Sequence, residues 1–167
     1  MAKDLKFIIG AFLVSILVIV GVAFLVSKGA SNQAETPLTE IPGLTSTPES
    51  YDLGNVPIDG GMVTKNYEIK NTTKEKMKLK KIATSCMCTK ASVEAGDKKT
   101  RFFGMEGHGD ANPAVNLELK AGETAKVVVN FDPAAHGPQG TGAFDRIVWL
   151  YFSEGVKELK FNGEVIK

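Results

Sequence analysis

The chain has 167 residues, 43% hydrophobic and 23% charged, which leaves room for one ordinary domain with a tail or anchor and excludes a multidomain enzyme. Its 20 Lys and Arg residues against 19 Asp and Glu residues give a formal net charge of +1, which disfavours a nucleic-acid binder. The two cysteines, Cys86 and Cys88, lie too close in sequence to staple a small disulfide-rich fold, so the core has to depend on hydrophobic burial.

An apolar segment, residues 7–26, lies near the N-terminus. Its sequence, FIIGAFLVSILVIVGVAFLV, carries no charge. As a helix rising about 1.5 Å per residue it is roughly 30 Å long, the thickness of a bilayer's hydrocarbon core. We therefore predict a single transmembrane helix over residues 7–26. A cleaved signal peptide is the alternative, although such peptides have a shorter apolar stretch of about 7–15 residues.

The charges that flank this segment predict its orientation. Lys3 and Lys6 precede it, whereas Lys28 alone follows it before a long stretch without Lys or Arg. The positive-inside rule then predicts that residues 1–6 are cytoplasmic and that the chain after the helix lies outside, in the periplasm or the extracellular space. We expect a single-pass protein of the inner or plasma membrane, in which residues 27–50, rich in Ser, Thr, Pro and Gly, form a flexible linker.

The remaining residues, 51–167, are predicted to form an all-β domain. Short runs of β-type sequence are separated by turn residues at intervals of roughly ten to fifteen, a spacing typical of an antiparallel β-sandwich. RIVWLYF is apolar on both faces, so we expect a central strand with Trp149 in the core. The other main runs are VTKNYEIKN, MKLKK, AKVVVNF and LKFNGEV.

Several short motifs follow one another along this domain in an order that is typical of one protein family. They are DLGN at residues 52–55, Gly60 and Gly61 in a polar turn, YEIKNTTKEKMKLKKI, TSCMCT and a late FDP. This order resembles the bacterial extracytoplasmic domain-of-unknown-function family 1573, whose pattern includes an aromatic-x-Leu/Phe-Gly opening and a Ser-Cys-Gly-Cys-Thr centre. The family is similar to the immunoglobulin-like modules of the major sperm protein and ciliary adaptor type.

The resemblance covers about residues 51–165 and is most specific at Ser85, Cys86, Cys88 and Thr89. This sequence departs from the pattern at Met87, where the family has Gly, and in an insert at about residues 98–116. The resemblance implies an immunoglobulin-like antiparallel β-sandwich of about seven strands in a secreted or anchored module. It implies no established activity.

The two cysteines leave three interpretations open. In an extended strand they point to the same face, with Cα atoms about 6.5–7 Å apart, so a disulfide between them would be strained and easily reduced. The pair is therefore a labile redox pair, half of a metal site, or two small buried residues.

Thiolate and thioether ligands favour Cu(I), so a metal site would use Cys86 and Cys88 with Met105 and His108 from the insert. His136 in a second Gly-rich loop is a further candidate.

We find no Gly-x-Ser-x-Gly elbow, phosphate loop or other catalytic motif, and we expect no enzyme activity. The leading hypothesis is a membrane-anchored binding module whose partner is another cell-envelope protein. The alternative is a Cu(I)-binding or redox-responsive envelope domain that uses Cys86-Met87-Cys88.

Overall fold

The computed structural model describes residues 15–17, 39–108 and 111–167. The chain divides into two compact units, Met1–Pro37 and Leu38–Lys167. In the first unit residues 15–17 are helical, and the rest of the predicted transmembrane helix, residues 7–26, lies outside the described residues. Within the part of the chain that the structure describes, no helix is long and apolar enough to span a bilayer.

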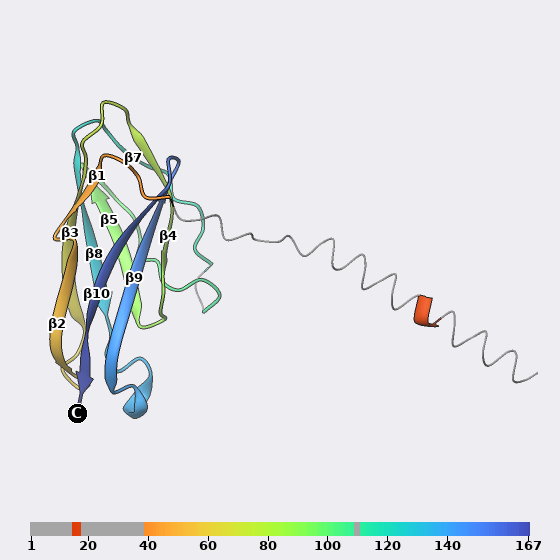
Figure 1. Cartoon of the computed structure of the whole chain (residues 1–167), viewed down its shortest axis with the longest axis vertical. Helices are drawn as coiled ribbons and strands as arrows, with labels where there is room; N and C mark the ends of the chain where they lie inside the picture. Colours follow the sequence, from red (N-terminus) through yellow and green to blue (C-terminus); the bar gives the residue numbers. More distant parts are fainter. Residues whose placement is uncertain (1–14, 18–38, 109–110) are drawn as a thin grey trace, which may run out of the picture. The chain divides into compact units, whose positions relative to one another are not determined.

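The second unit is a sandwich of two five-stranded sheets (Figure 1). One sheet has the order β1-β3-β8-β5-β6, with bounds Leu44–Thr47, Val63–Asn71, Thr124–Phe131, Thr89–Ala95 and Lys98–Lys99. The other has the order β2-β10-β9-β4-β7, with bounds Ser50–Pro57, Val156–Ile166, Gly142–Phe152, Met77–Thr84 and Leu117–Leu119. All pairs are antiparallel except β2 with β10, which is parallel.

The all-β sandwich is confirmed, but its described part has ten strands where about seven were predicted. Three of the ten are edge strands of four, two and three residues, namely β1, β6 and β7. Runs this short contain too few side chains to display the two-residue alternation from which strands are predicted.

The sandwich also begins before Tyr51, so the prediction that the linker extends to residue 50 is wrong. Ile41 and Leu44 are buried in the core, and β1 pairs with β3 in the register Leu44↔Asn71. Glu40 bridges Val156 of β10. Two apolar side chains in a Pro-rich and Thr-rich segment, together with backbone hydrogen bonds to β3 and β10, fix this part of the chain on the sheet edges.

Alternating side chains build the core as predicted on β3, β4, β8 and β10. On β8, for example, Val127, Val129 and Phe131 are buried and their neighbours are more exposed. β9 lies in the middle of its sheet, as expected. Trp149 is not a core residue, however, because Val148 and Leu150 occupy the inner face and the Trp149 indole N–H donates to Glu158 on the outer face.

The hydrogen bonds of the Asn71 side chain explain the turn that follows β3. Asn71 is fully buried, and its Nδ2 lies 2.7 and 3.1 Å from the carbonyl oxygens of Glu75 and Lys120. Its Oδ1 accepts hydrogen bonds from the Thr73 amide at 3.0 Å and the Thr73 hydroxyl at 2.7 Å. One side chain therefore links the β3–β4 turn to the loop before β8 and satisfies several partly buried backbone groups.

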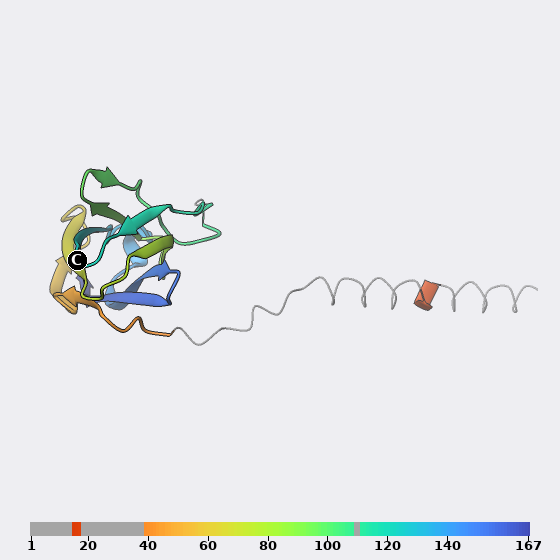
Figure 2. The same cartoon turned by 90° about the horizontal axis from the view of Figure 1, so that it is seen from above.

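The insert runs along the side of the sandwich next to β4 and β7 (Figure 2). Phe103 is buried and bridges Ala91 of β5, and the Val115 amide donates to the Lys80 carbonyl of β4. Lys81 pairs with Glu106 at 2.6 Å. The insert is thus fixed to β5 of one sheet and to β4 of the other.

Candidate functional site

Cys86 and Cys88 lie in the turn that joins β4 to β5 and form a disulfide, with Cα atoms 5.2 Å apart. The Thr89 amide donates to the Cys86 carbonyl at 3.1 Å and closes this turn. The separation of about 6.5–7 Å expected for an extended strand is therefore wrong. The observed separation is in the ordinary range for disulfides, so the argument for strain from a wide Cα separation does not apply.

The neighbours of the cysteines hold this turn in place. Ser85 donates its amide to the Ile147 carbonyl and accepts the Ile147 amide on its hydroxyl, both at 2.9 Å. The Thr84 hydroxyl lies 3.0 Å from the carbonyl oxygens of both Cys86 and Thr89 and has one proton to donate. These hydrogen bonds therefore fix the Thr-Ser-Cys-Met-Cys-Thr motif as the turn that connects the two sheets.

Each sulfur faces hydrogen-bond donors. Cys86 Sγ accepts the Cys88 amide at 3.1 Å and lies 3.2 Å from Nε2 of His136. A disulfide sulfur carries no proton, so His136 is the donor there and its proton is on Nε2. Cys88 Sγ accepts a hydrogen bond from Nε of Arg146 at 3.3 Å and lies 3.6 Å from the Thr89 hydroxyl.

Both sulfurs belong to buried residues, with Cys86 7% and Cys88 3% exposed, whereas His136 is exposed. Arg146 is partly buried, and this burial lowers the pKa of its guanidinium, with the nearby Asp145 carboxylate opposing the shift. An arginine remains protonated at physiological pH despite such a shift. A permanent positive charge therefore adjoins Cys88.

A pocket of about 360 Å³ adjoins the two donors. Phe131, Phe144 and Val165 give it apolar walls, and His136 and Arg146 contribute polar atoms. Most of its lining residues come from the end of β8, from the connection that contains the short 3-10 helix η1, Gly137–Gln139, and from the start of β9. This connection lies at one end of the sandwich, where β9 starts (Figure 1). The disulfide thus has an open neighbouring space on the side of His136 and Arg146.

The structure brings together only part of the predicted metal set. Ligand atoms of Cys86, Cys88 and His136 lie within 4.8 Å of one another. His108 is exposed on the insert and does not belong to this group, and Met105, also on the insert, is half-buried. The sulfurs of the pair are bonded to each other, so neither is available as a thiolate ligand in this oxidised state.

Arg146 was not a candidate from the sequence. It lies on β9, whose register with β4 brings Thr84 opposite Val148. The β5–β8 register pairs Thr89 with Phe131, five residues before His136. No local motif signals either contact, because both depend on pairing between strands far apart in the sequence.

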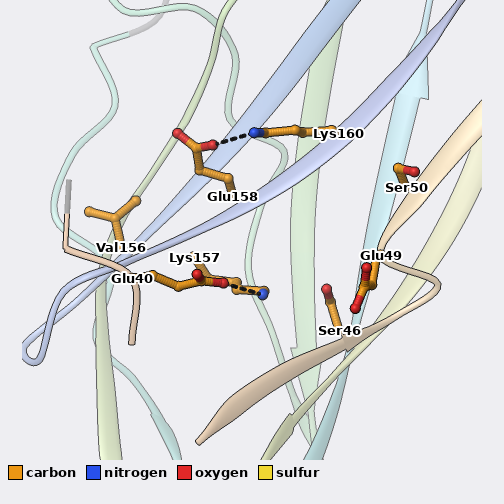
Figure 3. Close-up of a pocket in the computed structure, with 8 residues that line it drawn as sticks. All are labelled: Glu40, Ser46, Glu49, Ser50, Val156, Lys157, Glu158 and Lys160. Atoms are coloured by element: carbon orange, nitrogen blue, oxygen red, sulfur yellow. Dashed lines mark hydrogen bonds and ion pairs between the residues drawn. The ribbon is translucent and has the colours of Figure 1, made fainter. Parts of the chain in front are cut away.

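A larger groove of about 500 Å³ lies elsewhere, where β1, β2 and β10 meet (Figure 3). Four of its charged side chains form two ion pairs, Lys157 with Glu40 at 3.2 Å and Lys160 with Glu158 at 3.0 Å. β9 and β10 separate it from the strand that leads to the cysteines. Among the residues described, its lining contains no cluster of metal ligands.

Comparison with protein families supports the resemblance found in the sequence. Residues 44–100 match the model of the family described as "Protein of unknown function (DUF1573)", so the resemblance found in the sequence is confirmed. No curated protein matches the chain in sequence.

The chain is also similar to several solved structures. A protein of unknown function from Porphyromonas gingivalis W83 is similar with a TM-score of 0.50 at 15% identity, over 72% of this chain and 46% of that chain. This chain thus spans less than half of that relative. The ASH/PapD-like domain 7 of human CEP192 (TM-score 0.44, 13% identity) matches over 83% of this chain and 96% of its own. The C. elegans MSP family member WR4 (TM-score 0.34, 8% identity) matches over 74% and 98%.

Proposed function

Starting from a chain whose residues 44–100 are of the DUF1573 family, we propose that it is a membrane-tethered, extracytoplasmic module whose Cys86–Cys88 pair is a redox-responsive thiol–disulfide centre. One observation carries the proposal: each sulfur accepts a hydrogen bond from a basic side chain, His136 at Cys86 and Arg146 at Cys88. A disulfide sulfur is a weak acceptor that gains little from such partners, whereas a thiolate gains much. The surroundings therefore favour the reduced, charged state of the pair.

Reduction follows the ordinary exchange chemistry of disulfides. A thiolate of an external dithiol attacks Cys86 Sγ, and Cys88 leaves as a thiolate that the Arg146 guanidinium stabilises. The second thiol of the reductant then attacks the mixed disulfide and releases Cys86, beside His136 and the Cys88 amide. Two electrons and two protons pass to the pair, and the external dithiol becomes a disulfide.

The centre differs from a thioredoxin-like pair, which has two residues between its cysteines and a helix N-terminus beneath them. Here one residue separates the cysteines, and the turn lies between two strands. The guanidinium, the imidazole and one backbone amide supply the positive potential that a helix would otherwise provide. We propose a responder to the redox state of its surroundings and not an enzyme.

The location proposed from the sequence fits this chemistry. Disulfides persist in oxidising compartments such as the periplasm and cell exterior. With residues 7–26 as a transmembrane anchor, residues 1–6 inside and the sandwich outside, the pair would be exposed to such a compartment. The proposed partner is another cell-envelope protein that supplies the dithiol. Met87, 48% exposed between the two cysteines, and the pocket beside His136 give this partner a surface to contact.

A redox titration tests the proposal. The full chain in mild detergent is equilibrated with mixtures of reduced and oxidised dithiothreitol, quenched with acid and alkylated, and the added mass is measured. We expect one two-electron transition while the near-ultraviolet circular dichroism stays native. Modification of the cysteines only after the sandwich unfolds would contradict a functional centre.

A further inference from the structure

We propose that the reduced Cys86–Cys88 pair and His136 form a binding site for one Cu(I) ion. The inference rests on the proposed redox centre, because the disulfide has to open before either sulfur can bind a metal. It replaces Met105 and His108, the two partners expected from the sequence, with a ligand from the β8–β9 connection.

The ligand atoms are already close together. Nε2 of His136 lies 3.2 Å from Cys86 Sγ, and all three potential ligand atoms lie within 4.8 Å of one another. The turn keeps both sulfurs on one side, since Ser85 fixes it to β9 and the Asp132 amide donates to the Cys88 carbonyl at 2.8 Å. After reduction, a small rotation of the two cysteine side chains separates the sulfurs enough to admit an ion.

The ligand chemistry selects the metal. Two thiolates and an imidazole are soft to intermediate donors, which suit Cu(I). A structural Zn²⁺ site takes four protein ligands, and the described residues supply three. Exclusion of harder ions such as Mg²⁺ and Ca²⁺ follows from the absence of a carboxylate in the group.

The Arg146 guanidinium adds a charge argument. Two thiolates with a monovalent ion leave one negative charge, which the adjacent guanidinium neutralises. Two thiolates with a divalent ion leave no net negative charge. The guanidinium would then have no charge on the complex to neutralise, and it would repel the metal cation. The pairing of Arg146 with Cys88 therefore favours Cu(I) over Zn²⁺.

The step balances without any change in the oxidation state of copper. A dithiol first reduces the disulfide, with two electrons and two protons entering the pair. Cu(I) then displaces the two thiol protons and binds the two thiolates and Nε2 of His136, and the proton of Nε2 is transferred to Nδ1 through the solvent. Exchange with an external disulfide, which takes up the two electrons and becomes a dithiol, would re-form the Cys86–Cys88 bond and release the ion, so metal binding is coupled to the redox state.

Competition with a chromophoric Cu(I) chelator under anaerobic conditions tests the site. The full chain is reduced with a phosphine, freed of reductant and titrated, beside the unreduced chain and the variants Cys86→Ser/Cys88→Ser, His136→Ala and His108→Ala. Gln139→Ala, an exposed change in the same loop as His136, is the matched control. Circular dichroism verifies that each variant is folded.

We expect one Cu(I) per reduced chain and none in the unreduced chain or the double Ser variant. His136→Ala should weaken binding by at least about tenfold, the effect seen for loss of even an outer-shell partner. His108→Ala and Gln139→Ala should match the parent chain. Equal binding by the parent and His136→Ala, a loss confined to His108→Ala, or a preference for Zn²⁺ would overturn the proposal. A chain that titrates reversibly with dithiothreitol but takes up no Cu(I) would refute the copper site and leave the redox centre standing.

Discussion

Arg146 and Cys88, 58 residues apart in the chain, meet through a hydrogen bond of 3.3 Å from the guanidinium Nε to the sulfur. Burial lowers the pKa of Arg146 from its ordinary value, which is the electrostatic cost of holding the guanidinium in this position. A neutral disulfide sulfur gains little from a hydrogen bond with the guanidinium and so offsets little of that cost. A thiolate gains much more from the same hydrogen bond and offsets more of the cost. The relationship therefore connects the β9 strand to the redox chemistry of the β4–β5 turn.

Arg146→Gln tests this connection. The substitution keeps a polar side chain but removes the charge that stabilises the Cys88 thiolate, so reduction by dithiothreitol should become slower and less favourable. A hydrogen bond to a charged group contributes about 1.5–3 kcal/mol when buried, and partial exposure of Arg146 reduces this to about 1 kcal/mol, or roughly fivefold in the equilibrium. Arg101→Gln makes the same charge change on the insert and should leave the equilibrium unaltered. Equal shifts in both variants would show a general charge effect.

Asn71→Ala should be among the more destabilising single changes in the sandwich. It leaves the Glu75 and Lys120 carbonyls and the Thr73 amide, whose hydrogen bonds to the buried Asn71 side chain are partly buried, without that partner. We expect a loss of about 2–4 kcal/mol in the free energy of unfolding, measured with urea. Asn66→Ala on the exposed face of the same strand should change it by less than about 0.5 kcal/mol. Similar values for the two variants would contradict the role given to Asn71.

Tyr67→Phe isolates one buried hydrogen bond. The Tyr67 hydroxyl donates to the Lys160 carbonyl at 2.6 Å and links the two sheets, and the residue is fully buried. Its removal should cost about 1–2 kcal/mol, whereas Tyr51→Phe, which removes a solvent-exposed bond to the Asn66 carbonyl, should cost less.

The same tyrosine predicts a pH dependence. Burial, with a smaller contribution from Tyr51, raises the pKa of Tyr67 well above its ordinary value of 10.0. The neutral phenol therefore contributes its full stability below pH 10, and this contribution falls as the pH rises above that value, where the unfolded chain ionises first. Denaturation between pH 9 and pH 11 should show a steeper loss for the parent than for Tyr67→Phe. Parallel curves would refute this assignment.

Trp149 is the only tryptophan in the sequence, so its fluorescence reports the contact with Glu158. A hydrogen bond from Lys160 is the main cause that lowers the pKa of Glu158, and the Trp149 indole N–H contributes to the same shift. A lowered pKa means that the carboxylate stabilises the fold above its ordinary pKa, and that this stabilisation is lost as the pH falls through the lower value. The emission should change with a midpoint below 4.5, the ordinary pKa.

Glu158→Gln should abolish that transition, and Glu154→Gln in the adjacent β9–β10 turn should retain it. Persistence of the transition in Glu158→Gln would mean that another group controls the indole.

The sequence was informative where a pattern is local. Alternation on β3, β4, β8 and β10 needs only the two-residue repeat of a strand. The Trp149 prediction was wrong because RIVWLYF is apolar on both faces. In such a strand, the face that becomes the core depends on the other sheet and not on the run itself.

The candidate site was predictable only in its cysteines. Their turn geometry was missed because a Cys-x-Cys segment fits both a strand and a tight turn, and the bonds from Ser85 to Ile147 decide between them. His136 could be noticed as a loop histidine, but its position at Cys86 depends on the register Thr89↔Phe131. That register is a long-range property of the sheet, so the sequence could not distinguish His136 from His108.

The redox state of Cys86 and Cys88 in the native envelope tests the central claim most directly. Cells are quenched in acid, the thiols are alkylated with a mass tag, and the chain is recovered before and after a brief exposure to a membrane-permeant dithiol. Our account predicts an untagged, disulfide-bonded chain before exposure and two tags afterwards, with the tags lost again once the dithiol is removed. Two free thiols before exposure, or a pair that never accepts the tags without denaturant, would contradict a redox-responsive centre.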